Sequence, residues 1–340
     1  MSMKKWLYIA VSVLLAAGCA REKSVNENVA AKRYFDAWLQ VNYPRTPATG
    51  KGIYIIKDTP GTGMEVSDNT DMYVFVTYTQ RLLSGTVSAT TDPKMAQQLG
   101  NYKTTTYYGP VPWLVNKATL NAGIRETLRG MKVGGTRTAV IPGWLNVIAD
   151  YDTAEEYLDA ETGTHNIYTL HVADATTDIK KWEIDSLERY SKRVLDVADS
   201  VIYGFYYKCL NPEAVADKTV MPNDTTFYIN YTGRLLNGQV FDTTMEDTAK
   251  FYGIYSASKT YSPVAINKKE NYKNISMGDD STAEGNLVDG FAYCCSILRP
   301  FEKGTCTFYS TRGYAANGNG SSIPAYASLQ FDIDVVAKPK

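Results

Sequence analysis

An internal repeat constrains the fold of this chain of 340 residues more than any other feature of its sequence. Residues 72–86 (MYVFVTYTQRLLSGT) match residues 225–239 (TTFYINYTGRLLNGQ), which aligns Tyr78 with Tyr231. Two copies separated by so long an interval indicate tandem domains, because a solenoid needs more and shorter units.

The second copy is the longer one. Ile124 aligns with Phe291, which leaves about fourteen extra residues between the hairpin and this position in the second copy. We expect the insertion within residues 261–284, because Asn, Lys, Asp, Ser and Gly are abundant there and are typical of a solvated loop.

Each copy contains more strand-like than helical segments. In the first half of residues 226–244, inward and outward residues alternate as in a half-buried strand. Asn237-Gly238 then predicts a two-residue hairpin turn with positive φ at both positions. Residues 286–298 are the one internal helix that we expect in the second copy. This pattern indicates an α+β fold, in which one short helix packs on an antiparallel sheet.

Helical spacing of apolar residues also predicts a helix before each copy. We divide the chain into a targeting segment (1–18), a tether with an N-terminal helix (19–50), a first domain (51–176), a linker helix (177–201) and a second domain (202–340).

The N-terminus has the pattern of a secretory signal: Lys4 and Lys5, an apolar stretch, and small residues before Cys19. Its end, Leu15-Ala-Ala-Gly-Cys19, resembles a bacterial lipobox, although Ala16 stands where leucine is commonest. We expect acyl chains on Cys19 to anchor the mature protein in a membrane of the bacterial cell envelope, on the periplasmic or the outer surface. The alternative is ordinary secretion with a cysteine there by chance.

Composition excludes several classes of function. The net charge is −1 and no cluster of Lys or Arg suggests a nucleic-acid partner. His165 and His171 are the only histidines, which leaves little material for a His-based catalytic triad or metal site, and we expect both to be structural. Asp279-Asp280 lacks the alternating oxygen ligands of a calcium loop. We therefore expect no metal and no cofactor.

Four cysteines remain after Cys19, and none is in a Cys-x-x-Cys pair. An even number outside the cytoplasm permits disulfides. We favour buried, reduced side chains over any disulfide for these four residues, which are Cys209, Cys294, Cys295 and Cys306.

Five short motifs occur in order in the second copy: residues 231–235 (YTGRL), 238–242 (GQVFD), 287–291 (LVDGF), Gly313-Tyr314, and residues 323–332 (IPAYASLQFD). Together they resemble the FKBP-type peptidyl-prolyl cis-trans isomerases over roughly residues 203–338. The resemblance implies two tandem FKBP-like domains, each a twisted antiparallel sheet wrapped round a short helix.

The resemblance also implies the site residues. It places Tyr231, Phe241, Phe331 and Phe251 in the walls of an apolar pocket and Phe291 at its floor, where the family usually has tryptophan. Leu287, Val288 and Ile323 would line its sides, and Val288 would offer its N–H to the substrate. Tyr314 would donate a hydrogen bond to a substrate carbonyl, and Asp242 would polarise the pocket near the twisting amide.

The implied function is prolyl isomerisation and folding assistance, as a chaperone, for proline-containing polypeptides outside the cytoplasm. The first copy has Ser88-Ala89 where the second has Phe241-Asp242, and we expect it to keep the fold without the activity. One alternative is a non-catalytic lipoprotein that binds peptides or assists assembly. Another is a glycan-binding surface lipoprotein, suggested only by the abundant Tyr and Trp. In the first copy, Trp113 and Trp144 could mark a different binding surface, but we favour buried packing for both.

Overall fold

The computed structural model describes residues 27–67, 71–159, 163–215, 219–280, 282, 285 and 287–339. The expected targeting segment, with Cys19, lies outside the described residues. Within them, no helix combines the length and the apolar character that a membrane crossing needs.

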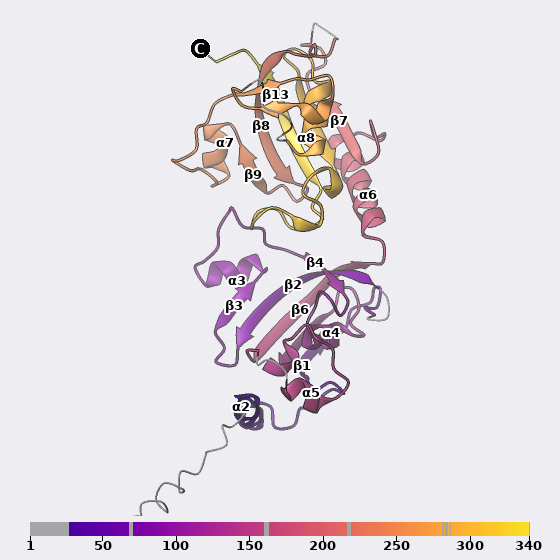
Figure 1. The fold of residues 1–340 in the computed structure, drawn as a ribbon, viewed down its shortest axis with the longest axis vertical. Coiled ribbons are helices and arrows are strands. Elements are labelled where there is room, and N and C mark those ends of the chain that lie inside the picture. Colours follow the sequence, from indigo (N-terminus) through magenta and orange to yellow (C-terminus); the bar gives the residue numbers. More distant parts are fainter. Residues whose placement is uncertain are drawn as a thin grey trace, which may run out of the picture.

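The fold is of mixed α and β structure, with antiparallel strands in two sheets that follow one another along the chain (Figure 1). The first sheet contains β1 (Tyr54–Thr59), β2 (Met72–Leu82), β3 (Val87–Thr90), β4 (Val111–Val115), β5 (Thr136–Ile141) and β6 (Asn166–Thr176). The second contains β7 (Phe205–Cys209), β8 (Thr226–Leu235), β9 (Val240–Thr243), β10 (Val264–Asn267), β11 (Ser276–Met277), β12 (Lys303–Phe308) and β13 (Leu329–Val336).

Helices lie before and between these strands. They are α2 (Glu27–Asn42), α3 (Pro93–Gln98), α4 (Ala122–Leu128), α5 (Ala154–Asp159), α6 (Ile179–Tyr190), α7 (Glu246–Phe251) and α8 (Asp289–Ile297). Short 3₁₀ turns occur at Gly143–Leu145, Tyr272–Asn274, Ser310–Arg312 and Ala315–Asn317.

The two sheets have the same strand order. The first runs β1-β5-β6-β2-β3 with β4 also paired to β2, and the second runs β7-β12-β13-β8-β10 with β9 also paired to β8. The register agrees as well: Tyr168 pairs with Gln80, and Phe331 pairs with Gly233, in each case two residues beyond the aligned tyrosines Tyr78 and Tyr231. The sequence repeat is therefore also a repeat of topology.

The extra residues of the second copy lie between β10 and α8. Val111 on β4 pairs with Val76, and Val264 on β10 pairs with Ile229, so the two copies are still aligned there. The insertion contributes β11, which extends the second sheet beyond β10.

Each sheet has its own hydrophobic core, and a short helix of the same half packs into it. In the first half, Asn121 caps α4 by accepting a hydrogen bond from the amide of Ile124 at 2.8 Å, and Ile124 and Leu128 are buried. In the second half, α8 buries Phe291 together with Cys294 and Cys295. With 7 and 9 residues, each helix is too short to be stable in water alone, so packing of its apolar side against the sheet holds it in place.

The hairpin turn differs from the prediction. Only Gly238, at φ +91°, has positive φ, whereas Asn237 does not. The amide of Leu235 bonds to the carbonyl of Gln239, and that of Gly238 to the carbonyl of Leu235, so three residues and not two form the loop. A three-residue hairpin needs a residue in the left-handed conformation, which Gly238 supplies. A separate register shift after Gly233 leaves Phe241 as an extra residue on β9.

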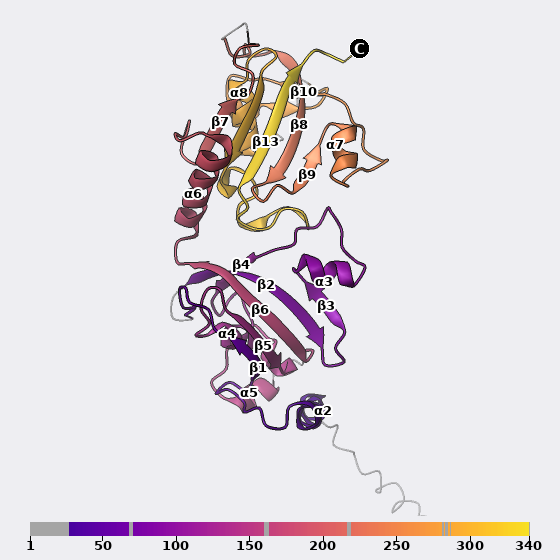
Figure 2. The same cartoon turned by 180° about the vertical axis from the view of Figure 1, so that it is seen from behind.

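The linker helix is shorter than the predicted range 177–201. It continues past α6 as a π-helical turn, Ser191–Leu195, and ends where Asp196 adopts φ +56°. The helix runs beside the second sheet (Figure 2), where Leu187 packs with Tyr206 and Tyr309.

The described cysteines are free: three are buried, and Cys209 is half-buried. Both histidines contact backbone or neighbouring polar groups. The Nδ1 atom of His165 accepts a hydrogen bond from the amide of Gly143 at 2.8 Å, and that of His171 lies 3.0 Å from the hydroxyl of Thr136. The described residues contain no group of three or more His, Cys, Asp or Glu that could hold a metal ion.

Candidate functional site

A cavity of about 290 Å³ opens in the second half, between the sheet, the start of α8 and the loop that follows β12. Its lining brings together side chains from β8, β9, β11, α8 and β13. The lining residues are Tyr231, Phe241, Asp242, Met277, Leu287, Val288, Phe291, Tyr314, Asn319, Ser322, Ile323 and Phe331.

Aromatic rings form the base of this cavity around Phe331. The ring centroid of Phe331 lies 4.6 Å from that of Phe291, 5.7 Å from that of Phe241 and 6.0 Å from that of Tyr231. Tyr231 and Phe291 also meet edge to face, at 5.4 Å. These are the separations at which aromatic pairs attract one another, so the rings hold each other in place.

Gly233 makes room for this cluster. A Cβ atom at this position would lie 2.6 Å from Cε2 of Phe241 and 2.9 Å from Cε1 of Phe331, closer than carbon atoms approach without a shift. The absent side chain therefore allows the two rings to pack across β8.

The polar part of the cavity is the carboxylate of Asp242. The hydroxyl of Tyr231 donates to Oδ2 at 2.6 Å, and the amide of Thr243 donates to Oδ1 at 2.9 Å. Lys259 forms an ion pair with the same carboxylate. Three donors thus fix the orientation of Asp242 at the edge of an otherwise aromatic wall.

Burial, together with the neighbouring Asp242 carboxylate, raises the pKa of the Tyr231 hydroxyl well above its ordinary value. Tyr231 therefore stays protonated at neutral pH and acts as a donor. A hydroxyl that stays protonated suits hydrogen bonding better than acid–base chemistry.

Another polar cluster is centred on the residue that follows Val288, which lines the cavity. Asp289, the first residue of α8, accepts a hydrogen bond from the hydroxyl of Tyr272 at 2.9 Å and forms an ion pair with Arg312. These contacts join the inserted segment, the helix and the loop that carries Tyr314. The negative charge is favourably placed in the first turn of the helix.

All but one of the sequence-predicted pocket residues line this one cavity. The exception is Phe251, at the end of α7, whose side chain is 81% exposed and packs only against Tyr252 among the aromatic rings. The prediction that Phe251 walls the pocket is therefore wrong. In the sequence, Phe251 follows soon after Phe241 and Asp242. That position does not indicate which way its ring points.

Sequence reasoning missed four residues of the site: Met277, Lys259, Asn319 and Ser322. Met277 belongs to the insertion, and the other three lie outside the regular strands and helices. Neither helical nor strand periodicity marks such positions. Ion-pair partners far apart in sequence, such as Lys259 and Asp242, leave no local signal.

The first half lacks these groups at the corresponding positions. Ala89 pairs with Gln80 as Asp242 pairs with Gly233, so the register places Ala89 where the carboxylate would be. Tyr78 remains half-buried, and its ring packs against Trp113 at 5.2 Å. Trp144 is buried against Phe35 and His165, so both tryptophans have packing partners.

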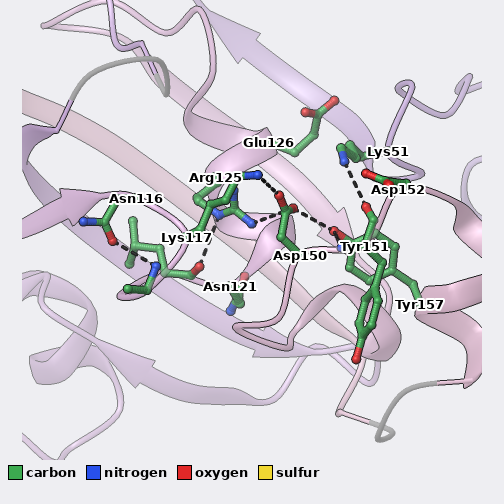
Figure 3. Close-up of polar contacts among 12 residues, drawn as sticks. Lys51, Asn116, Lys117, Asn121, Arg125, Glu126, Asp150, Tyr151, Asp152 and Tyr157 are labelled. Carbon is green, nitrogen blue, oxygen red and sulfur yellow. Dashed lines mark hydrogen bonds and ion pairs between the residues drawn. The ribbon is translucent and has the colours of Figure 1, made fainter.

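An ion-pair network lies at the loops around α4 in the first half (Figure 3). The buried guanidinium of Arg125 donates to Oδ1 of Asp150 at 3.0 Å and to the carbonyl of Leu120. The hydroxyl of Tyr157 donates to Asp150 at 3.1 Å, and the exposed Lys117 forms an ion pair with its other oxygen. Hydrogen bonds from Lys117, Arg125 and Tyr157 hold the pKa of the Asp150 carboxyl well below its usual range.

No protein-family model matches the chain, and no curated protein matches it. Among solved structures, similar chains include the three FKBP domains of wheat FKBP73, at 14% identity over 86% of this chain and 98% of that chain, with a TM-score of 0.28. FkpA from Escherichia coli matches at 17% identity over 51% of this chain and 70% of that chain, with a TM-score of 0.29. A peptidyl-prolyl cis-trans isomerase from Pseudomonas syringae pv. tomato matches at 16% identity over 48% and 97%, with a TM-score of 0.31. Similarity at this level carries no argument about function, which rests on the cavity itself.

Proposed function

We propose that the second half of this chain is a peptidyl-prolyl cis-trans isomerase domain of the FKBP type. One observation carries the proposal: the aromatic rings, the carboxylate and the tyrosine that the five motifs imply line one cavity of about 290 Å³. These residues come from segments spread over a hundred positions, so their convergence is not a consequence of local sequence.

The reaction needs no nucleophile and no proton transfer. Rotation about a peptide bond is opposed by a barrier of about 18–20 kcal/mol, because planarity preserves resonance. A twisted amide has lost charge separation, so an apolar cavity favours it over the planar ground state. A thousandfold acceleration needs about 4 kcal/mol of such preference for the transition state.

The chain's own residues suit these tasks. The rings of Phe331 and Phe291 offer an apolar base for the proline ring, with Phe241 at its side. Asp242, held by Tyr231, puts a fixed negative charge near the twisting amide. Tyr314 can donate its hydroxyl to a substrate carbonyl, and the amide of Val288 can do the same from the start of α8.

In this proposal the chain is a tandem pair of FKBP-like domains, residues 51–176 and 202–340, of which the first is not catalytic. In the first half, the Phe241 ring is replaced by Ser88 and the Asp242 carboxylate by Ala89. The Phe291 ring at the floor is replaced by Ile124. The clients would be proline-containing polypeptides folding outside the cytoplasm, and acyl chains on Cys19 would hold the protein on a membrane. Mass spectrometry of the mature protein tests the anchor, which an N-terminus other than acylated Cys19 would exclude.

Isomerisation of a short Xaa-Pro peptide, measured by NMR exchange on the full chain, tests the activity. We expect wild type to accelerate exchange, and Phe241→Ala and Asp242→Ala each to lose about tenfold or more. Ser88→Ala is the matched control, because Ser88 occupies the place of Phe241 in the first half, and it should leave the rate unchanged.

Wild type at the uncatalysed rate would remove the isomerase. If such a wild type still bound the peptide at Phe241, the chain would be a peptide-binding module. An equal loss of rate in Ser88→Ala would show that the first half shares in catalysis.

A further inference from the structure

A second cavity, of about 250 Å³, lies between the two halves of the molecule. Its walls come from β2, β4, β6 and α6 on one side and from the end of β8 and the segment before β13 on the other. Figure 1 shows that segment, in yellow, facing the first half. The cavity is lined by Phe75, Tyr107, Pro110, Pro112, Ala173, Asp174, Trp182, Ser186, Leu235, Leu236, Asn237, Pro324, Ala325, Tyr326, Ala327 and Ser328.

The walls are apolar and aromatic, and their main polar groups are already paired. The rings of Phe75 and Trp182 stack with centroids 4.0 Å apart. The indole N–H of Trp182 donates to Asp174 at 2.8 Å, and the hydroxyl of Tyr107 donates to the carbonyl of Pro110 at 3.0 Å. A site whose polar groups are paired in this way suits an aliphatic or aromatic group and not a charged one.

Contacts between the halves hold these walls in place. The amide of Tyr107 donates to the carbonyl of Ser321 at 2.7 Å, and the hydroxyls of Tyr73 and Tyr326 lie 3.1 Å apart. The side-chain amide of Gln239 donates to the carbonyls of Thr104 and Thr106 at 3.3 and 3.2 Å. The cavity is therefore a built feature, present before any ligand binds.

This cavity is adjacent to the proposed isomerase site. Ile323 lines the site and the next residue, Pro324, lines the second cavity, so one segment separates the two. On β8, Tyr231 lines the first cavity and Leu235 the second. Four residues of strand span about 14 Å, and four residues of an extended peptide span a similar length.

We propose that the cavity between the halves is a second subsite for the client, which binds a large apolar side chain about four residues from the proline in the isomerase site. This inference rests on the proposed function. It gives the non-catalytic half a role, since Phe75, Pro110 and Pro112 come from it. The client class is then an unfolded segment with both a proline and a nearby aliphatic or aromatic residue.

Paired peptides test the subsite on the full chain. Each peptide has one proline, with Phe or Ala placed four residues before it or four residues after it. Affinity is measured by calorimetry, and tryptophan fluorescence, compared with that of a Trp182→Phe variant, reports the second cavity. We expect the better-placed Phe to tighten binding about tenfold, as burial of one large apolar side chain allows, and to change the Trp182 signal.

Filling the cavity should remove this gain. Ser186 lies one helical turn after Trp182, so Ser186→Phe puts a ring beside the Phe75–Trp182 stack. The variant should bind the Phe and Ala peptides equally and still isomerise the short Xaa-Pro peptide at the wild-type rate. Ser200→Phe adds the same ring at an exposed position away from the cavity and should keep the gain.

Ala173→Leu fills the cavity from β6 and gives a second result if Ser186→Phe folds poorly. Equal affinity of wild type for the Phe and Ala peptides, or an undiminished gain in both filled variants, would overturn the subsite. Failure to bind or isomerise the short peptide would instead overturn the proposed function.

Discussion

At the scale of single residues, the candidate site depends on the absence of a side chain at Gly233. Gly233 pairs with Phe331 across the sheet, and the space above it is occupied by the rings of Phe241 and Phe331. The first half has Gln80 at this position. Ser88 stands in place of Phe241 there, so no second ring has to be accommodated. Glycine on β8 is thus a condition for the aromatic base of the cavity.

Gly233→Ala should displace the Phe241 ring, lower stability by about 1–3 kcal/mol through overpacking, and weaken proline-peptide binding. Urea unfolding and calorimetry measure the two effects. Gly238→Ala is the control: no atom lies within 4 Å of its new Cβ, but φ +91° makes the position strained. It should cost about 1 kcal/mol without loss of binding. Unchanged peptide affinity in Gly233→Ala would contradict this account.

A buried carboxyl on the linker helix makes stability depend on pH. Burial raises the pKa of Glu183 above its ordinary 4.5, although the amide of Ser310 donates to it at 3.1 Å. The folded state then binds more protons than the unfolded state, so stability falls as pH rises from 4.5 through the raised pKa.

Glu183→Gln should therefore gain stability relative to wild type between pH 4 and pH 7, because the amide does not ionise. Urea midpoints across this range measure the difference. Glu188→Gln makes the same change of side chain on the exposed side of the same helix and is the matched control. A pH-independent difference for Glu183→Gln would contradict the assignment.

At the scale of elements, the loops around α4 illustrate how the first half uses its polar groups. Arg125 is buried on α4 and Asp150 compensates its charge, with Tyr157 bonded to the same carboxylate (Figure 3). The network joins the helix to the loops on either side of it. Because the Asp150 pKa is depressed in the folded state, its contribution is present above about pH 4 and is lost as pH falls.

Asp150→Asn should destabilise the first half by about 3 kcal/mol, because it leaves the buried Arg125 charge without its partner. Lys117→Ala removes the partner whose side chain is 73% exposed, and should cost far less, because solvent screens an exposed ion pair. Urea unfolding followed by tryptophan fluorescence reports this half, which contains Trp38, Trp113 and Trp144. Equal losses in the two variants would show that burial of Arg125 is not the decisive factor.

At the scale of the whole molecule, the segment 101–112 of the first half reaches the second half. Gln239 donates to two of its carbonyls, Thr104 donates to the carbonyl of Gly253 at 2.5 Å, and the ring of Tyr107 packs against the second core. These contacts join the first half to the β8–β9 hairpin, to the end of the α7 segment and to the second core.

Gln239→Ala should loosen this connection. Loss of the two hydrogen bonds should speed amide hydrogen exchange in residues 101–112 by about tenfold. Exchange in the central strands β5 and β12 should not change, which gives an internal control. Unaltered protection of residues 101–112 would show that the halves are held by the remaining contacts alone.

Features that depend on near neighbours in the chain, or on the repeat, could be predicted from the sequence. Alternation predicted the hairpin strands, and the alignment of the two copies distinguished the shared strands from Phe241-Asp242 and Phe291, which only the second copy has. The family resemblance of the motifs also indicated which side chains line a cavity. Some of them lie on strands or on α8, whereas Leu287, Tyr314 and Ile323 lie in irregular segments, where no period marks them.

The directions in which the irregular segments turn depend on tertiary packing and could not be predicted from the sequence. In the folded chain Phe251 lies outside the cavity, Lys259 pairs with Asp242, and the second cavity lies between the halves. The physical reason is that these contacts join residues far apart in the chain. Their geometry follows from how the sheets, α6 and the long loops pack, and no local period records it.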